Sequence, residues 1–229
     1  EIAQWTLLKR RAIVSSRQPE PVGGVTTMAF LRTGLIQETD PQIETRRLWL
    51  RPPVMSDFTA WAELRAQSRS HLTPWEPAWT ENELTRWAFR RRLRIHQRDQ
   101  REDLGYAFFL FEAGTGRLVG GLTLSNVRRG VTQAAALGYW IGAPFVCKGL
   151  MSEAVRAVIP FAFDGLELHR LEAACLPNNA GSIKVLEKNG FVREGLARKY
   201  LKINAHWQDH ILFSLLCDDA AGWPAGGTQ

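Results

Sequence analysis

The sequence lacks an apolar run long enough to cross a bilayer, which takes about 18 or more consecutive residues. The basic cluster at residues 9–11 is followed by only three apolar residues, at 12–14, before polar residues return. Such a run is also too short for the apolar core of a secretory signal peptide. We therefore expect a cytoplasmic protein with no membrane partner.

Cysteine is scarce as well, with three in the chain: Cys147, Cys175 and Cys217. Their number is odd, and their spacing contains neither a Cys-x-x-Cys pair nor the histidines of a zinc site. These features exclude a disulfide framework and give no sign of a structural zinc. We expect reduced thiols and no metal.

Acidic residues are in the minority, 23 against 29 lysines and arginines, which gives a formal net charge of +6. The isoelectric point is about 9.6. A basic chain of this kind indicates an anionic partner, although a phosphate-bearing small molecule, an acidic peptide and RNA all qualify. With 229 residues, 45% of them hydrophobic, the chain is long enough for one large domain with tails.

The tails are predicted from proline and glycine residues and from the absence of a hydrophobic period. Residues 1–42 contain three prolines and a Gly-Gly pair but no sustained period, so we expect an N-terminal extension, partly disordered or non-native, with Met28 as a candidate natural start. The Gly- and Pro-rich residues 218–229 are expected to form a flexible tail. The domain itself is assigned to residues 43–217.

Alternating and helical periods predict the elements of this domain. Strands are expected at about 45–51, 106–111, 117–127, 133–141, 170–176, 191–203 and 206–216; helices at about 58–65, 80–101, 149–165 and 180–188. The helix between the fourth and fifth strands makes a β-helix-β unit within hairpin-connected strands. The predicted fold is therefore α/β (α+β), a mixed, mostly antiparallel sheet of about seven strands flanked by helices.

Two segments before the first hairpin leave alternatives open. The loop at 71–79 holds two prolines, and its Trp75 and Trp79 flank Glu76, so it either lines an acceptor pocket or is packed down by its tryptophans. Thr80 and Glu83 predict a capping box at the start of the 80–101 helix. Its seven arginines suggest an RNA-binding face or, more simply, a solvated one, and we expect no aromatic side chain to interleave with them for base stacking.

Residues 138–155 contain the strongest candidate site. An aromatic strand passes through a Pro- and Gly-containing loop into an amphipathic helix that begins after Lys148 and Gly149. Free N–H groups, the positive end of the helix dipole and a nearby lysine suit a phosphate-bearing ligand. An ordinary strand-to-helix turn with a permissive glycine is the alternative.

Six motifs then occur in order, and together they resemble one family. They are L-x-P-W-E-P from Leu72, S-N-V-x-R-G from Ser125, L-G-Y-W-I from Leu137, K-G-L-M-x-E-A from Lys148, N-x-x-S with K-x-G-F from Asn179, and W-x-D-H from Trp207. Over about residues 43–217 the chain resembles the GNAT superfamily of acetyl-CoA-dependent N-acetyltransferases, and within it the ribosomal-protein alanine N-acetyltransferases.

The resemblance implies that acetyl-CoA is the co-substrate and that an amine attacks its thioester directly in a ternary complex. It also implies splayed central strands, where the strand at Tyr139–Ile141 pairs with the pantetheine arm. The cofactor-binding residues expected from it are Tyr139, Trp140, Ile141, Val146, Cys147, Lys148, Gly149, Leu150, Met151, Ser152, Asn179, Ser182 and Lys188.

Catalytic and acceptor residues follow from the same motifs. Asn179 and Ser182 match the N-x-x-S positions, where Ser182 would protonate the departing thiolate; as residues, they also suit a helix N-cap and its first turn. Trp75, Glu76, Asn126, His206 and Asp209 are the expected substrate-binding residues.

Two departures from the family pattern bear on the chemistry. Val146, Cys147 and Met151 replace the usual loop residues, so backbone amides must hold the phosphates, and Cys147 raises an acetyl-cysteine route as a minor alternative. Ala136 stands where relatives often have a glutamate base. An α-amine, with a pKa near 8, needs less help than a lysine, and Glu76, His206 and Asp209 remain candidates for accepting the proton.

The predicted function is acetylation of a protein N-terminal α-amine, such as that of a ribosomal protein, with ribosome association and a monomeric or homodimeric state as further expectations. Acetylation of a small amine is one alternative. A non-catalytic basic protein that binds RNA or the ribosome on the same scaffold is the other.

Overall fold

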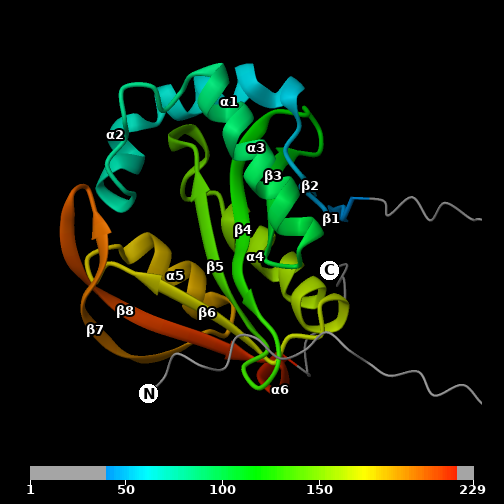
Figure 1. The fold of residues 1–229 in the computed structure, drawn as a ribbon, viewed down its shortest axis with the longest axis vertical. Helices are drawn as coiled ribbons and strands as arrows, with labels where there is room; N and C mark the ends of the chain where they lie inside the picture. Colours follow the sequence, from blue (N-terminus) through cyan, green and yellow to red (C-terminus); the bar gives the residue numbers. More distant parts are fainter. Residues whose placement is uncertain (1–39, 221–229) are drawn as a thin grey trace, which may run out of the picture. The chain divides into compact units, whose positions relative to one another are not determined.

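The computed structural model describes residues 40–220 (Figure 1). The expected N-terminal extension lies outside the described residues except for its last three, and the expected C-terminal tail except for residues 218–220. The chain divides into two units, Glu1–Glu38 and Thr39–Gln229, and all that follows concerns the second.

The second unit is organised around one sheet of eight strands in the order β1-β2-β3-β4-β5-β6-β8-β7. Only β5 and β6 are parallel; every other neighbouring pair in the sheet is antiparallel. This confirms the mixed, mostly antiparallel sheet, with eight strands because a two-residue strand, β1, precedes the first one predicted. The strands are β1 Ile43–Glu44, β2 Leu48–Arg51, β3 Gly105–Glu112, β4 Leu118–Arg128, β5 Ala134–Ile141, β6 Arg170–Cys175, β7 Val192–Ile203 and β8 His206–Leu216.

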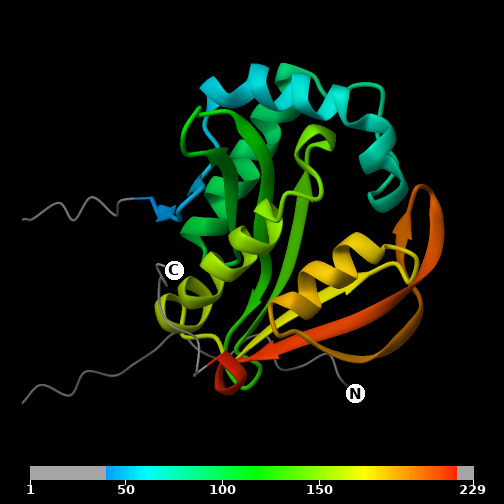
Figure 2. The same cartoon turned by 180° about the vertical axis from the view of Figure 1, so that it is seen from behind.

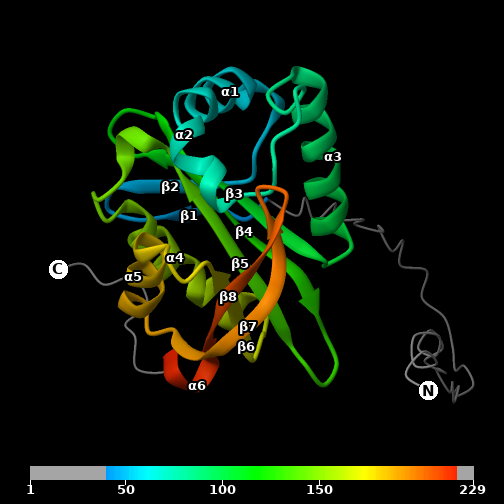
Figure 3. The ribbon, with the colours of Figure 1, turned by 90° about the vertical axis from the view of Figure 1, so that its left-hand side faces the viewer.

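Helices cover both faces of the sheet (Figures 2 and 3). Neighbouring residues of β3 show how the faces divide: the Phe109 ring lies 6.2 Å from Phe89 of α3, whereas the Phe108 ring lies 5.5 Å from Phe161, just after α4. Adjacent strand residues point to opposite faces, so α3 lies on one face and α4 on the other. The helices are α1 Phe58–Gln67, α2 Arg69–Leu72, α3 Arg86–Arg101, α4 Leu150–Pro160, α5 Ala180–Lys188 and α6 Cys217–Ala220. None of the helices described between residues 40 and 220 has the length and apolar character that crossing a membrane requires.

Two local predictions need correction. The α3 helix starts at Arg86 instead of Thr80: Thr85 is the N-cap and accepts a hydrogen bond from Ala88 N at 3.2 Å. The Thr80 hydroxyl bonds the Glu83 carboxylate instead of backbone, and Glu83 pairs with Arg92. The segment 71–79 was predicted to be a loop, but its first part is helical: α2 ends at Leu72 and a 3₁₀ turn spans Thr73–Trp75. Pro74 is compatible with this turn because the first residues of a helix have no intrahelical acceptor for their N–H groups.

The two parallel strands, β5 and β6, separate toward their C-terminal ends. β5 pairs with β6 only where Ala134–Ala136 face Arg170–Glu172. Beyond Ala136 and Glu172, β5 stays paired with β4 as far as Ile141, and β6 stays paired with β8 as far as Cys175. The backbone edge of β5 at 137–141 therefore faces no strand, which confirms the predicted splay.

A hairpin of β7 and β8 closes the sheet. Its turn residues Asn204 and Ala205 have φ of 44° and 67°, the left-handed conformation that two-residue hairpin turns require. The Asn204 N–H donates a 3.0 Å hydrogen bond to the carbonyl oxygen of Glu76. The hairpin tip is thereby tied to the segment that follows α2.

Candidate active site

A cavity of about 630 Å³ occupies the gap between β5 and β6. Its walls come from both separated strands, at Leu137–Ile141 and Ala173–Leu176, and from the start of α4 and the inner side of α5. We call the part near α4 and α5 the anion end. The opposite part, between residues 71–76 and the β7–β8 hairpin, is the hairpin end.

The anion end is shaped by backbone geometry. Cys147 and Gly149 have φ of 58° and 74°, and Gly149 is the N-cap of the eleven-residue helix α4. Left-handed residues next to a helix start form a concave group of N–H donors that binds anions. A side chain at Gly149 would be strained because of this φ value.

The loop before α4 is held in place by Arg47, a residue that the sequence analysis did not select. Its Nη1 donates a 3.0 Å hydrogen bond to the Lys148 carbonyl, and its Nε lies 2.6 Å from Glu153 of α4. The Glu153 carboxylate also accepts from the Thr45 hydroxyl at 2.6 Å. Burial favours a higher pKa for Glu153, but the hydrogen bonds from Thr45 and Arg47 outweigh it and lower the pKa below its usual range.

Most of the expected cofactor residues line this cavity, and one does not. Those along its wall are Tyr139, Trp140, Ile141, Val146, Cys147, Gly149, Leu150, Met151, Ser152, Asn179, Ser182 and Lys188. Lys148 is outside the lining, with its ammonium 5.4 Å from the Phe145 ring centre. Lys184, one turn before Lys188 on α5, lines the cavity instead. A positive charge at the anion end thus comes from α5.

Two hydroxyl groups meet in the middle of the cavity. Tyr139 Oη lies 2.9 Å from Ser182 Oγ, and Asn179 caps α5 by accepting from Ser182 N at 3.0 Å. Burial raises the pKa of the Tyr139 phenol far above its ordinary value of 10.0. The phenol therefore keeps its proton and is available as a hydrogen-bond donor beside Ser182.

The hairpin end is lined by side chains from segments far apart in the sequence. His71, Trp75 and Glu76 lie on one side; Leu201, Ile203 and His210 lie on the other. Arg65 of α1 holds the Glu76 carboxylate with both terminal nitrogens, at 3.2 and 2.5 Å, and the Trp79 indole N–H donates to it at 2.8 Å. Glu76 is thus fixed in place by an ion pair with an arginine that is only 7% exposed.

Three expected substrate residues do not line the cavity. Asn126 is exposed in a β-bulge of β4, where its φ is 52°. His206 bonds the Asn204 carbonyl within the hairpin turn at 2.8 Å, and Asp209 accepts from Lys199 N at 2.8 Å where β7 bulges. In this structure His206 and Asp209 thus support local backbone.

His210, next to Asp209 in the W-x-D-H motif, lines the cavity and is 2% exposed. Its Nδ1 lies 3.0 Å from the Gln208 carbonyl oxygen. Because a carbonyl can only accept, Nδ1 must carry the hydrogen, which leaves Nε2 as the basic nitrogen of the neutral ring.

A second cavity of about 410 Å³ lies against the other face of the sheet, between α1 and α3. It shares Glu76 and Trp140 with the first and also contains Arg65, Arg92 and His96. Burial first, and then the charge of Arg92, lowers the pKa of His96 below its ordinary 6.5. The second cavity therefore lies behind Glu76 and contains a partly buried histidine that is largely neutral at pH 7.

Residues 47–192 match the acetyltransferase (GNAT) domain family, which is well over half of the chain. The chain belongs to this family. It is 36% identical to the probable N-acetyltransferase YjcK of Bacillus subtilis over 177 residues, covering 77% of this chain and 98% of that protein. It is 34% identical over 187 residues to the [ribosomal protein uS5]-alanine N-acetyltransferase of Escherichia coli, covering 81% of this chain and 94% of the other.

One similar protein has been solved with a derivative of CoA bound. The Mycobacterium smegmatis RimJ structure, in complex with CoA-disulfide, superposes with a TM-score of 0.75 at 28% identity, covering 79% of this chain and 90% of that one. As a GNAT acetyltransferase this protein is an enzyme that transfers acetyl groups to amines. Among residues 40–220 no three His, Cys, Asp or Glu side chains are grouped so that they would hold a metal ion.

The side chains that sequence reasoning missed are Arg47, Arg65, His71, Lys184 and His210. Only His210 carried a signal, since it ends a quoted motif. Arg47 acts through Lys148 and Glu153, which are distant in sequence, and Arg65 acts through Glu76. His71 and Lys184 are at the cavity wall because the fold places their segments there.

Proposed function

We propose that this GNAT enzyme acetylates the N-terminal α-amine of a protein, with a ribosomal protein as the leading candidate. The observation that carries the proposal is the two-ended cavity, whose anion end and hairpin end meet at Ser182 and Tyr139. The relatives named for ribosomal-protein alanine and serine acetylation support the acceptor class. A cytoplasmic location and association with the ribosome belong to the same proposal.

Acetyl-CoA, as co-substrate, would supply the acetyl thioester. The left-handed Cys147 and Gly149, with α4 behind them, would bind its phosphates through backbone N–H groups, aided by Lys184 and Lys188. The free edge of β5 at 137–141 would pair with its extended arm as an added strand would. Backbone groups of the chain would thus bind most of the ligand. The side chains of Val146 and Cys147, which differ from the usual residues of this loop, would then matter little.

The proton transfers are assigned to the middle and the hairpin end. Nε2 of His210 would accept the proton of the attacking amine, replacing the absent carboxylate at Ala136. The Ser182 hydroxyl would donate to the departing sulfur while the protonated Tyr139 phenol donates to Ser182 Oγ. Glu76, held by Arg65 and Trp79, would position the acceptor and not act as base.

We favour direct transfer over an acetyl-cysteine route. Cys147 lies in the loop at the anion end, where the phosphates would bind, whereas the acetyl group would sit near Ser182. A monomer or homodimer is compatible with this site, since every residue in the scheme comes from one chain.

The test is release of free CoA when the protein is given acetyl-CoA and peptides that begin with Ala or Ser. We expect release with these peptides and little with the same peptides blocked at the N-terminus. A second candidate is a small amine, and the hydrogen bond from Asn204 N to the Glu76 carbonyl oxygen favours it, because this bond links the β7–β8 hairpin to the segment that holds Trp75 and Glu76. Activity on free polyamines or aminoglycosides, with none on the peptides, would replace the proposal by that alternative.

A further inference from the structure

The positive charge of this protein is concentrated on one helix. The sixteen residues of α3 include seven arginines and one aspartate, a net charge of +6, which equals the formal net charge of the whole 229-residue chain. The other residues of the chain therefore carry equal numbers of acidic and basic side chains. Basicity is a property of α3, and the transfer reaction proposed above makes no use of it.

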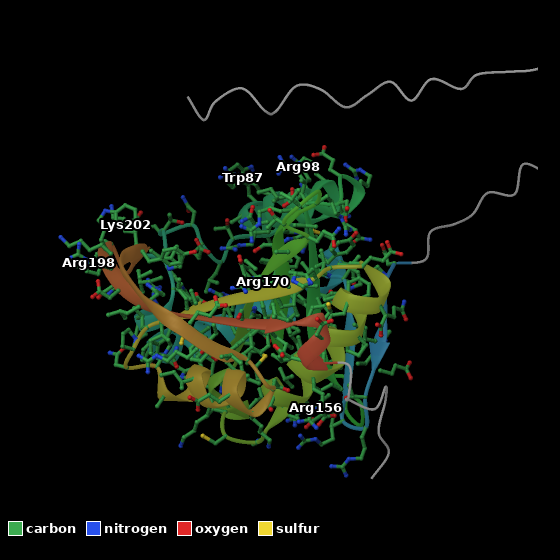
Figure 4. All side chains as sticks on the ribbon, turned by 90° about the horizontal axis from the view of Figure 1, so that it is seen from below. Trp87, Arg98, Arg156, Arg170, Arg198 and Lys202 are labelled. Carbon is green, nitrogen blue, oxygen red and sulfur yellow. The ribbon has the colours of Figure 1, made fainter. Side chains whose placement is uncertain are left out.

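Most of these arginines project from the side of α3 that faces away from the sheet. The helix packs through Phe89 and Leu93, which are 1% and 6% exposed. We define the α3 arginine face by the exposed residues Arg86, Trp87, Arg90, Arg91, Arg94, Arg98 and Arg101. Figure 4 shows Trp87 and Arg98 projecting outward from the helix. At 1.5 Å per residue the face is about 22 Å long.

Few acidic groups compensate this charge. Within residues 40–220, Arg98 pairs with Asp99 at 2.6 Å, while Arg90, Arg94 and Arg101 have no ion-pair partner. Arginines four residues apart repel one another and cost an isolated helix about 0.2–0.5 kcal/mol per pair. An anionic partner would remove this repulsion.

The exposed tryptophan distinguishes among anionic partners. Trp87 is 67% exposed, and the Arg91 guanidinium lies 5.9 Å from its ring centre. This corrects the expectation that no aromatic side chain interleaves with the arginines. An indole beside guanidinium groups is suited to stacking on unpaired bases while arginines contact phosphates. A membrane surface fits less well, because the apolar side of α3 is already buried in the protein and cannot enter lipid.

We propose that the α3 arginine face binds single-stranded RNA, with Arg90, Arg94 and Arg101 on phosphates and Trp87 stacked on a base. The inner side of the same helix, through Phe89 and Arg92, lines the second cavity. RNA on the outer side would leave the main cavity open. The proposal does not depend on which amine the enzyme acetylates.

The experiment is fluorescence anisotropy of the full chain with a labelled single-stranded RNA of about 16 nucleotides, over a salt series from about 50 to 200 mM. We expect binding whose affinity falls steeply with salt. In the triple variant Arg90→Gln/Arg94→Gln/Arg101→Gln, affinity should fall at least about 30-fold and the salt slope by about 2. Acetyl-CoA turnover should stay that of the unaltered protein, and thermal stability should be equal or slightly higher, because repulsion between neighbouring arginines of α3 is relieved.

A matched variant removes three exposed cations elsewhere. Arg198, Lys199 and Lys202 of β7 are also exposed, and Figure 4 shows Arg198 and Lys202 far from α3. Their replacement by glutamine should change RNA affinity by less than about threefold. An equal loss in both triple variants would mean attraction by net charge alone and would overturn the proposal, as would absence of binding at low salt.

Trp87→Ala tests the class of partner. It should weaken binding of single-stranded RNA by about tenfold and leave the salt slope unchanged, since stacking is not ionic. If Trp87→Ala has no effect, or if polyaspartate or anionic lipid vesicles compete as well as RNA at equal charge, the surface is a general anion-binding or membrane-binding one and the RNA assignment is wrong.

Discussion

The anion end of the cavity is built mainly from backbone, and the hairpin end from side chains. At the anion end the determinants are φ angles at Cys147 and Gly149, a helix start and a strand edge without a partner. At the hairpin end they are the Arg65–Glu76 pair, the Trp79 indole and His210. A backbone site tolerates changes of side chain, which explains how Val146 and Cys147 can stand in the loop, whereas a side-chain site can change its acceptor by single substitutions.

The largest effect is expected where the two ends meet. Ser182→Ala should lower kcat by about 100-fold, because the donor to the departing sulfur is lost. The Kd for CoA, measured by calorimetry, should stay within about twofold since the anion end relies on backbone. Ser125→Ala, an exposed serine outside the cavity lining, serves as the control. An unchanged kcat would leave Ser182 with a structural role only.

The next variant affects the anion end alone. Gly149→Val places a β-branched residue at a φ of 74°, which costs about 1–2 kcal/mol or forces the loop to change. We expect the Kd for CoA to rise by about 30-fold, with a far smaller effect for Gly114→Val, where a side chain would meet open space. Equal affinities for the two variants would show that the loop geometry is not what binds the phosphates.

At the hairpin end, Glu76→Gln should raise the KM for the acceptor by about tenfold and leave CoA binding unchanged. It should also lower the free energy of unfolding by about 2–3 kcal/mol, because the buried Arg65 loses its counter-ion. The exposed Arg117–Glu112 pair gives the comparison, and Glu112→Gln should leave the melting temperature unchanged. A CoA affinity that falls with Glu76→Gln would mean that the two ends are not separable.

A smaller effect is expected for the proposed base. His210→Gln should lower kcat by about fivefold at pH 7, and the deficit should shrink as pH rises, because more of an α-amine with a pKa near 8 is then neutral. A pH–rate profile of both proteins measures this. A deficit that is constant with pH would assign His210 to packing instead of proton transfer.

The smallest effect concerns the second cavity behind Glu76. The pKa of His96 is lowered in the folded protein, so below about pH 6.5 the unfolded chain takes up a proton that the folded chain does not. Stability should therefore fall as pH drops through this window, by less than about 1 kcal/mol. Denaturant titrations at pH 7.5 and 5.5 should show a smaller difference for His96→Gln, and the same difference in both proteins would contradict the assignment.

The sequence by itself determined the features that local rules control. Strand periodicity predicted β3 to β8 to within about two residues, Asn179 was recognised as the cap of α5, and the glycine before α4 marked the anion end. These succeed because hydrophobic period, capping and left-handed φ depend on neighbours in the chain. The predicted start of α3 was wrong because Thr85, which the sequence analysis did not consider, is the N-cap, while Glu83 pairs with Arg92 instead of completing a capping box with Thr80.

Only the tertiary structure decided the hairpin end and the Tyr139–Ser182 contact. Ser182 and Tyr139 are 43 residues apart, Arg47 and Glu153 are 106 apart, and the β7–β8 hairpin meets Glu76 through one backbone hydrogen bond. Contacts between residues so far apart produce no periodic pattern in the sequence. His206 and Asp209 were therefore chosen over His210, although burial in the folded sheet, which the motif does not encode, puts His210 at the cavity wall.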